Sequence, residues 1–381
     1  IWMRVVHRMD VWCHGDTTRI LVIRIPSIVV HVCRLDEEAD EFTTLIHSAL
    51  MSTSFQALVV RQAEEKQYSR KIETRSTDDL PEGEVLVRVH YSSLNYKDGL
   101  SCIGAKGVTR EYPHTPGIDA AGIVESSSSD EFKSGDSVIV TSYDLGMNTS
   151  GGFGQFIRVP SSWVVPLPEG MTLRESMVYG TAGYTAGLSV NALLHQGLTP
   201  EQGPIVVTGA SGGVGSVSVA LLAGLGFQVK ASSGKTEAAD FLRELGATEI
   251  IGREEVNDES GKPMLKQLWA GGIDTVGGNA LSTMIKACQA GGAVAVTGNV
   301  ASPDLPITVF PFILRGVNVL GIDSQNTPMA LRRKVWNLLA GEWKPKNLEN
   351  LAKECTLDQL DPEIERILSG AQQGRVLVNL Q

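Results

Sequence analysis

The spacing of hydrophobic and polar residues divides the chain into two kinds of pattern. From Phe55 to about Pro168, short apolar runs such as EVLVRVHYSSL (84–94) alternate with period two between turns rich in Gly, Pro and Ser. This alternation predicts an antiparallel, barrel-like domain. From about residue 175, strand-like runs such as IVVTG (205–209) alternate with helical stretches such as VSVALLAGL (217–225). The second pattern predicts a doubly wound parallel sheet with helices on both faces.

The same alternation places KPMLKQLWA (262–270) at a helix position. After it, the tail shows helical periodicity in MALRRKVWNLLAGEW (329–343) and PEIERILSG (362–370), and closes with a strand, GRVLVNL (374–380). We expect this tail to return and complete the first domain.

A glycine-rich turn follows the apolar strand at residues 205–207. In IVVTGASGGVG (205–215), the glycines Gly209, Gly212, Gly213 and Gly215 lead directly into an apolar helix. A strand, a glycine turn and a helix present free backbone N–H groups at a helix N-terminus, where the helix dipole favours a pyrophosphate. The spacing departs from a strict G-x-G-x-x-G, so an ordinary tight turn is the alternative. With the surrounding alternation, the motif predicts a dinucleotide site.

The end of the next strand indicates which dinucleotide is bound. FQVKA (227–231) is followed by Ser232, Ser233, Gly234 and Lys235, where a site for NAD usually carries Asp or Glu against the ribose hydroxyls. Hydroxyl groups and a lysine suit the dianionic 2′-phosphate of NADP instead, and Arg253 could add a second cation. The alternative is that Lys235 merely opens a solvated helix.

Composition excludes several classes of function. The chain has 381 residues and a net charge of −10, with acidic residues spread along it, so neither a nucleic-acid nor an anionic-membrane partner is expected. No uninterrupted apolar run reaches the roughly 18 residues of a membrane span. The five cysteines have no C-x-x-C spacing, which argues against a disulfide framework or a structural zinc site. A cytoplasmic protein is predicted.

Residues 1–50 differ in composition from the rest of the chain. They contain no lysine and hold four of the seven histidines, His7, His14, His31 and His47. The segment runs into MSTSFQALVV, which resembles a natural start at Met51, so we expect translated upstream sequence or a misplaced start. A transit peptide is the alternative interpretation, and the acidic residues within the segment weaken it.

Taken together, the motifs resemble one family. Seven segments in order carry the resemblance: SSLNYKDGL (92–100), PGIDAAGIV (116–124), GTAGYTAGL (180–188), VVTGASGGVG (206–215), WAGGIDTVGG (269–278), PFILRGVNVLGIDS (311–324) and GRVLVNL (374–380). They are similar to the zinc-free medium-chain dehydrogenases/reductases, in the quinone-oxidoreductase-like branch that contains the acryloyl-CoA reductases.

The resemblance implies an α/β fold with two domains. It implies an N-terminal extension outside the fold (1–54), a GroES-like β-barrel-type catalytic domain (55–175), a doubly wound Rossmann domain for NADPH (176–325), and a C-terminal completion of the catalytic domain (326–381). Zinc-dependent relatives carry Gly-His-Glu where this chain has Gly117-Ile118-Asp119. We therefore expect no metal.

The resemblance also implies the chemistry. Hydride from NADPH adds to the β-carbon of an enoyl thioester, an enone or a quinone while charge develops on the carbonyl oxygen. Asn95 is the candidate donor or positioning group, and Tyr96 is the candidate nicotinamide contact and proton donor. Asp98 is a further catalytic candidate, although Lys97 and Asp98 could equally form a structural ion pair or cap.

Cofactor contacts follow from the same resemblance. Three groups of residues are implied: a pyrophosphate cradle, a 2′-phosphate site and the nicotinamide side. They are, in that order, Ser211, Gly212, Gly213 and Val214; Ser233, Gly234, Lys235 and Arg253; and Thr181 and Asn299, with Arg375 reaching the cofactor from the other domain.

The sequence leaves two alternative functions open and predicts one assembly. The protein could reduce a quinone or another enone in place of acryloyl-CoA, or it could bind NADPH without catalysis. The apolar strand VNVLGID (317–323) is expected at the edge of the nucleotide sheet, where it would pair with its twin in a homodimer.

Overall fold

The computed structural model describes residues 8–13, 19–25, 28–32, 52–64 and 67–381. Its contacts separate two compact units, residues 1–54 and residues 55–381. The first unit contains an antiparallel sheet of β1 (Arg8–Cys13), β2 (Arg19–Ile25) and β3 (Ile28–Val32). Most of residues 1–50, including His7, His14 and His47, lies outside the described residues, so the expectations about that segment stay predictions.

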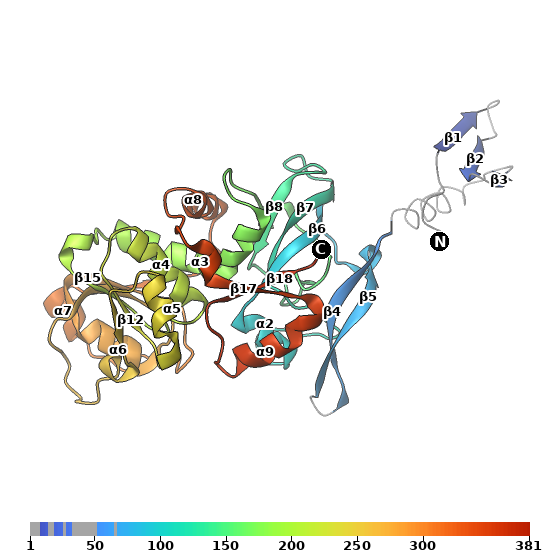
Figure 1. Cartoon of the computed structure of the whole chain (residues 1–381). Helices are drawn as coiled ribbons and strands as arrows, with labels where there is room; N and C mark the ends of the chain where they lie inside the picture. The colour runs from blue at the N-terminus through green and yellow to red at the C-terminus, as the bar shows by residue number, and fades with distance from the viewer. Residues whose placement is uncertain (1–7, 14–18, 26–27, 33–51, 65–66) are drawn as a thin grey trace. The chain divides into compact units, whose positions relative to one another are not determined.

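The first sheet of the second unit forms the barrel-like domain. Its strands run in the order β10-β8-β7-β6-β18-β17, with β9 also paired to β6, and β4 pairs with β5 beside it. The C-terminal strand β18 pairs antiparallel with β6 and parallel with β17, so the tail supplies the last two strands at one end of this sheet (Figure 1). The bounds are β4 Ser54–Gln62, β5 Tyr68–Ser76, β6 Val85–Leu94, β7 Asp119–Ser127, β8 Ser137–Thr141, β9 Phe156–Val159, β10 Val164–Pro166, β17 Ala352–Thr356 and β18 Arg375–Asn379.

The second sheet is entirely parallel, as the sequence pattern predicts. Its strand order is β13-β12-β11-β14-β15-β16. From β11 the chain first adds strands on one side and then, from β14, on the other side. Doubly wound sheets bind nucleotides at this switch between β11 and β14. The bounds are β11 Ile205–Val207, β12 Val229–Ser232, β13 Glu249–Ile251, β14 Trp269–Asp274, β15 Cys288–Val296 and β16 Asn318–Gly321. The predicted α/β fold, a GroES-like domain joined to a Rossmann domain, is confirmed.

Helices cover the parallel sheet and join the two domains. Figure 1 shows α4, α5, α6 and α7 around the parallel sheet, and α3 between the two sheets. One apolar cluster contains Ala121 and Leu377 of the barrel sheet together with Val207 and Ile273 of the parallel sheet, so the domains share a core. The helices are α2 Tyr96–Cys102, α3 Leu173–His195, α4 Gly213–Gly224, α5 Ala239–Glu244, α6 Gly278–Lys286, α7 Phe310–Arg315, α8 Met329–Ala340 and α9 Leu360–Leu368.

The expected helix over residues 262–270 is wrong. Residues 262–268 are irregular, and β14 begins at Trp269. The backbone N–H groups of Leu265 and Leu268 donate sideways, to the carbonyls of Lys286 and Ala287, at 3.0 and 2.9 Å. Because these amides are used between segments, they cannot form the i to i−4 bonds of a helix.

Candidate active site

A single carboxylate, Asp119, collects side chains from three segments of the chain. It begins β7, is fully buried, and accepts hydrogen bonds from Ser93 Oγ at 2.6 Å and Asn95 Nδ2 at 2.7 Å. From α3, Thr181 donates its backbone N–H at 2.9 Å and its hydroxyl at 2.5 Å. These donors satisfy the hydrogen-bonding capacity of a carboxylate that water does not reach.

Arg375 supplies the opposite charge in the same buried space. It opens β18, is 3% exposed, and places Nη2 at 3.8 Å from Asp119 Oδ2 and 2.8 Å from Ser93 Oγ. Its Nη1 donates to the Leu94 carbonyl at 3.1 Å and to Asn95 Oδ1 at 3.3 Å. Burial lowers the pKa of Arg375, while Asp119 opposes that shift. We call Ser93, Asn95, Asp119, Thr181 and Arg375 the aspartate network.

A kink in α3 makes room for the network. Gly180 has φ 51° inside the helix, and a Cβ there would lie 2.2 Å from Ser93 Oγ and 2.4 Å from Asp119 Oδ2. Only glycine allows both the left-handed backbone and this close approach. The kink releases the N–H of Thr181 from the helix and directs it to Asp119.

The structure gives Asn95 and Asp98 specific positions. The Asn95 Nδ2 group donates to Asp119 and, at 3.2 Å, to the Ser93 carbonyl, so both of its hydrogens are engaged. Asp98 is fully buried and accepts from the backbone N–H groups of Asn95 and Ile118 at 2.7 and 2.9 Å. Burial and the charge of Asp119 raise the pKa of Asp98 to about 7. Asp98 therefore occupies the cap position that was the alternative to a catalytic role.

Lys97 and Tyr96 lie on the outer side of the same turn. The Nζ atom of Lys97 donates to Gln325 Oε1 at 3.1 Å, toward the loop after β16. Tyr96, the first residue of α2, is 45% exposed. Its ring is thus accessible next to a buried network.

The glycine turn before α4 has the geometry of a phosphate cradle. A Cβ on Gly215 would lie 2.3 Å from the Gly209 carbonyl oxygen, and Gly209 itself has φ 58°. Gly212 is the N-cap of α4, so the turn ends at the N-terminus of that helix, with Val214 in its first turn. A Cβ on Gly213 would lie 3.0 Å from Arg375 Nη1, which brings this predicted cofactor residue to the turn.

The residues predicted to hold a 2′-phosphate lie together beside this turn. Ser233 Oγ donates to Ser211 Oγ at 3.2 Å and accepts from the Lys235 backbone N–H at 3.1 Å. The guanidinium of Arg253 covers Gly234, where a Cβ would lie 2.1 Å from Nε. Burial lowers the pKa of Lys235, and the charge of Arg253 acts in the same direction. We call Ser211, Ser233, Gly234, Lys235 and Arg253 the serine–lysine cluster.

The two residues predicted to lie at the nicotinamide side, Thr181 and Asn299, have different surroundings. Thr181 joins the aspartate network, whereas Asn299 is exposed and its Cα lies 3.1 Å from the position of a Cβ on Gly277. The hydroxyl of Thr185, one turn further along α3, donates to the Thr181 carbonyl at 2.7 Å. Tyr184 stacks on Trp336 with ring centroids 5.8 Å apart.

Sequence reasoning missed several residues that shape the site. Ser142 has φ 65°, and its hydroxyl lies 2.9 Å from Thr181 Oγ1. Arg332 is fully buried between the rings of Tyr143 and Tyr184, 4.3 and 4.8 Å from their centroids. Asp119 carried a signal, since it is a charged residue at the start of an apolar run; the others carried none.

The residues present fit a dinucleotide with an additional phosphate. The turn leaves space that a Cβ would fill, and the cations of the serine–lysine cluster lie half-buried or exposed beside it. Among the residues that the structure describes, no three His, Cys, Asp or Glu side chains are grouped so that they could hold a metal ion. In the same residues, no helix is both long and apolar enough to span a membrane.

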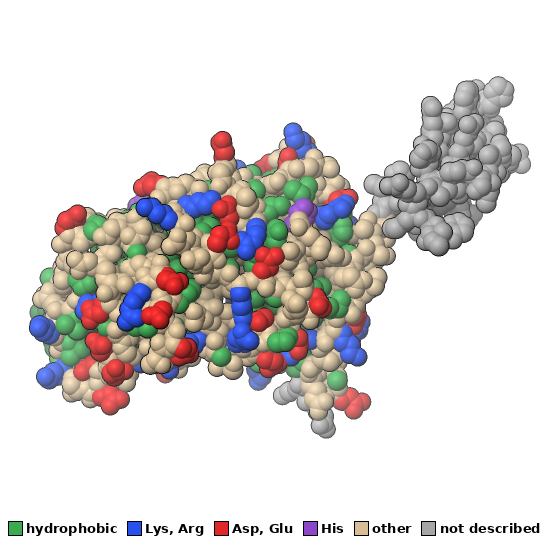
Figure 2. Space-filling view, in the orientation of Figure 1, with side chains coloured by type: hydrophobic (Ala, Val, Ile, Leu, Met, Phe, Trp, Pro, Cys, Tyr) green, Lys and Arg blue, Asp and Glu red, His purple; other side chains and the backbone are tan. Residues whose placement is uncertain are grey.

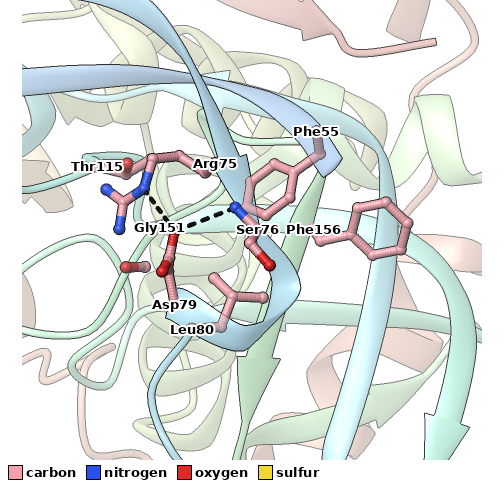
Figure 3. Close-up of a pocket in the computed structure, with 9 residues that line it drawn as sticks. Phe55, Arg75, Ser76, Asp79, Leu80, Thr115, Gly151 and Phe156 are labelled. Carbon is pink, nitrogen blue, oxygen red and sulfur yellow. Dashed lines mark hydrogen bonds and ion pairs between the residues drawn. The ribbon is translucent and has the colours of Figure 1, made fainter. Parts of the chain in front are cut away.

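Two other features of the surface differ from this site. A small pocket lies apart from it, between Phe55, Phe156 and the turn where Arg75 and the Ser76 backbone N–H donate to Asp79 (Figure 3). None of the predicted site residues lines that pocket. On the face in Figure 2, acidic and basic side chains are interspersed. Neither surface competes with the site described above.

Comparison with known proteins agrees with this geometry. The families described as alcohol dehydrogenase GroES-like domain and zinc-binding dehydrogenase match residues 81–169 and 213–341. The putative quinone oxidoreductase YhfP of Bacillus subtilis is 48% identical over 333 residues, 87% of this chain and 100% of that protein. The acrylyl-CoA reductase AcuI of Ruegeria pomeroyi is 47% identical over 328 residues, 86% of this chain and 99% of that protein.

Solved structures of such relatives carry either dinucleotide. The YhdH oxidoreductase from Salmonella enterica in complex with NADP has a TM-score of 0.83 at 42% identity, covering 86% of this chain and 100% of that one. YhfP with NAD bound has a TM-score of 0.84 at 47% identity, with the same coverage. The chain is thus an oxidoreductase and belongs to the branch of the medium-chain dehydrogenases/reductases that contains these quinone oxidoreductases and acryloyl-CoA reductases.

Proposed function

We propose that the protein reduces the activated C=C bond of an enoyl thioester, acryloyl-CoA to propanoyl-CoA, with NADPH and without a metal ion. The choice of substrate rests on the 47% identity to an acrylyl-CoA reductase across 99% of that protein. The serine–lysine cluster favours NADPH over NADH, because Lys235 and Arg253 would attract the 2′-phosphate. NAD bound to YhfP makes NADH the necessary control.

In the proposed site, bound NADPH supplies the hydride that adds to the β-carbon of the substrate. The pyrophosphate lies against Ser211, Gly212, Gly213 and Val214, and Thr181 lies at the nicotinamide side. Asn95 acts as a positioning group, because both of its amide hydrogens are engaged by Asp119 and the Ser93 carbonyl.

Tyr96 is the proposed proton donor to the α-carbon. Its exposure of 45% leaves the ring accessible to a ligand next to the aspartate network. A positioned acid contributes about 100-fold or more to such a step. Tyr96→Phe should therefore lower kcat about 100-fold with little change in KM, whereas Tyr68→Phe, on β5, should match the wild type.

The first test is NADPH oxidation by the full chain with acryloyl-CoA, with a simple quinone, and with NADH in place of NADPH. Faster turnover of acryloyl-CoA that depends on NADPH supports the proposal. Turnover of the quinone alone would move the assignment to a quinone reductase. NADPH binding by calorimetry without turnover of any enone would indicate a non-catalytic binding protein.

The assembly proposed with this function is a homodimer through β16. This strand is at the end of the parallel sheet, and apolar side chains around it are exposed: Ile313 by 68%, Leu314 by 65% and Val319 by 38%. Edge strands with apolar surface pair readily. Light scattering should give twice the chain mass, and Val319→Lys should shift it toward monomer; a wild-type monomer at micromolar concentration would exclude the dimer.

We also propose a cytoplasmic location. The described cysteines Cys102, Cys288 and Cys355 are free and buried, which suits a reducing compartment. Fractionation of cells that express the protein would test this.

A further inference from the structure

The segment from Ala371 to Arg375, which we call the strap, connects the two groups of site residues. It follows α9 and leads into β18, and two hydrogen bonds join it to the nucleotide-binding domain. The Lys235 ammonium donates to the Gln372 carbonyl at 2.5 Å, and the Gly374 N–H donates to the Ser211 carbonyl at 2.9 Å. Gly374 also lies close to the Phe241 ring of α5, where an added Cβ would be 3.2 Å away.

The strap ends in the guanidinium that holds the aspartate network. Arg375 directly follows Gly374, and its Nη atoms contact Ser93, Asn95 and Asp119. Gly374 is closely packed and held, because its N–H donates to the Ser211 carbonyl and its backbone lies so near Leu351 that an added Cβ would be 2.5 Å from the Leu351 carbonyl oxygen. A displacement at Gln372 would therefore be transmitted to Arg375 over three residues.

We propose that Lys235 is a positioning residue for the catalytic side as well as a phosphate ligand, because its bond to the Gln372 carbonyl fixes the strap and thereby Arg375. An ammonium has three N–H donors, so one can hold the carbonyl while others meet a phosphate. The ligand role rests on the proposed NADPH function, whereas the contact with the strap does not. Lys235 would thus contact the 2′-phosphate of the cofactor and, through the strap, also hold Arg375 of the aspartate network.

The two roles of Lys235 give different results with NADH, which has no 2′-phosphate. If Lys235 is only a phosphate ligand, Lys235→Met leaves catalysis with NADH unchanged. If Lys235 also holds the strap, the same variant lowers kcat with saturating NADH about fivefold, while the calorimetric Kd for NADH stays within twofold.

Hydrogen–deuterium exchange of the full chain without cofactor or substrate provides a readout independent of activity. Lys235→Met should speed exchange of the Gly374 amide about tenfold, since its bond to Ser211 depends on the strap. Lys230→Met is the matched control, because Lys230 pairs with Glu249 at 2.5 Å on the neighbouring strand and should leave that amide unchanged. Arg253→Met should weaken NADPH binding without faster exchange of the strap.

A second pair of variants displaces the strap without changing Lys235. Gly374→Ala must move the Leu351 carbonyl or the strap, and should lower kcat with NADH. Gly370→Ala is its control, because Gly370 has a similar φ of 71° but nothing within 4 Å of an added Cβ.

Wild-type exchange at Gly374 in Lys235→Met would overturn the proposal, and so would wild-type NADH turnover in a Gly374→Ala variant whose strap amides exchange faster than in the wild type. Failure of the proposed function looks different. The wild type would then turn over no enone, while the exchange experiment would still report whether Lys235 holds the strap.

Discussion

In the aspartate network both charged side chains are buried, whereas the serine–lysine cluster leaves its cations half-buried or exposed. Asp119 and Arg375 are 0% and 3% exposed, and donors from β6 and α3 surround the carboxylate. Lys235 is only partly covered, and Arg253 lies on the surface over Gly234. One group holds an arrangement before any ligand binds, and the other offers charge to a ligand.

The difference has a physical reason. Groups that position a reacting molecule work best when they do not reorganise, and burial with complete hydrogen bonding keeps the aspartate network fixed. A phosphate can be selected by exposed cations, because the phosphate itself supplies the missing charge. We therefore expect substitutions in the aspartate network to reduce stability and turnover together, and substitutions in the serine–lysine cluster to change mainly the affinity for NADPH.

The largest effect is expected from Asp119→Asn. The substitution leaves the Arg375 guanidinium buried without its counter-charge, and breaking a buried pair costs about 3–5 kcal/mol of unfolding free energy. Urea unfolding measures this loss. Glu125→Gln is the control, because the Arg88–Glu125 pair is exposed and should contribute under about 1 kcal/mol. Equal, small losses for both variants would contradict the central place given to Asp119.

Lys235→Glu tests the other side of the comparison. It places a carboxylate against the 2′-phosphate, so the Kd for NADPH should rise about 100-fold, or about 2.7 kcal/mol, while NADH binding changes little. Calorimetry with both dinucleotides measures the difference. Equal weakening of NADPH and NADH would show that Lys235 does not face the phosphate.

The sequence predicted these two groups unequally. Ser233 and Lys235 follow the second strand of a βαβ unit, whose geometry brings them to the glycine turn at Ser211, so local spacing was sufficient. Asp119 meets Thr181 and Arg375 only through tertiary contacts across 62 and more residues of chain. No local pattern encodes such a meeting, and the kink at Gly180 lies inside α3, where buried residues precede and follow it.

Short-range periodicity predicted the fold correctly, but it predicted a helix at 262–270 where the structure has none. Alternating strands and helices specify a doubly wound sheet from short-range periodicity alone. Apolar spacing between Leu265 and Trp269 also suits a helix, but Arg315 donates to the Leu265 carbonyl at 2.6 Å and the neighbouring amides pair with other segments. Tertiary hydrogen bonds override the local preference there.

A smaller effect concerns pH and Asp98. Burial and the charge of Asp119 raise its pKa to about 7, against about 3.9 in an unfolded chain. Between these values the folded protein holds the extra proton, so stability falls as pH rises toward 7. From pH 5 to pH 8 the wild type should lose about 2.6 kcal/mol of unfolding free energy relative to Asp98→Asn. A constant difference between the two proteins across this range would show that Asp98 is ionised throughout.

The smallest expected effect comes from a comparison of two serine hydroxyls, one in the serine–lysine cluster and one outside it. Ser233 Oγ accepts from the Lys235 backbone N–H at 3.1 Å, and Ser260 Oγ accepts from that of Lys262 at 3.3 Å, in an exposed loop. Both alanine variants lose this local bond, but only Ser233→Ala removes the contact with Ser211. Its Kd for NADPH should rise about fivefold, near 1 kcal/mol, with Ser260→Ala unchanged. Because the two losses are locally equivalent, any difference measured by calorimetry reports the cofactor site, and identical affinities would remove Ser233 from it.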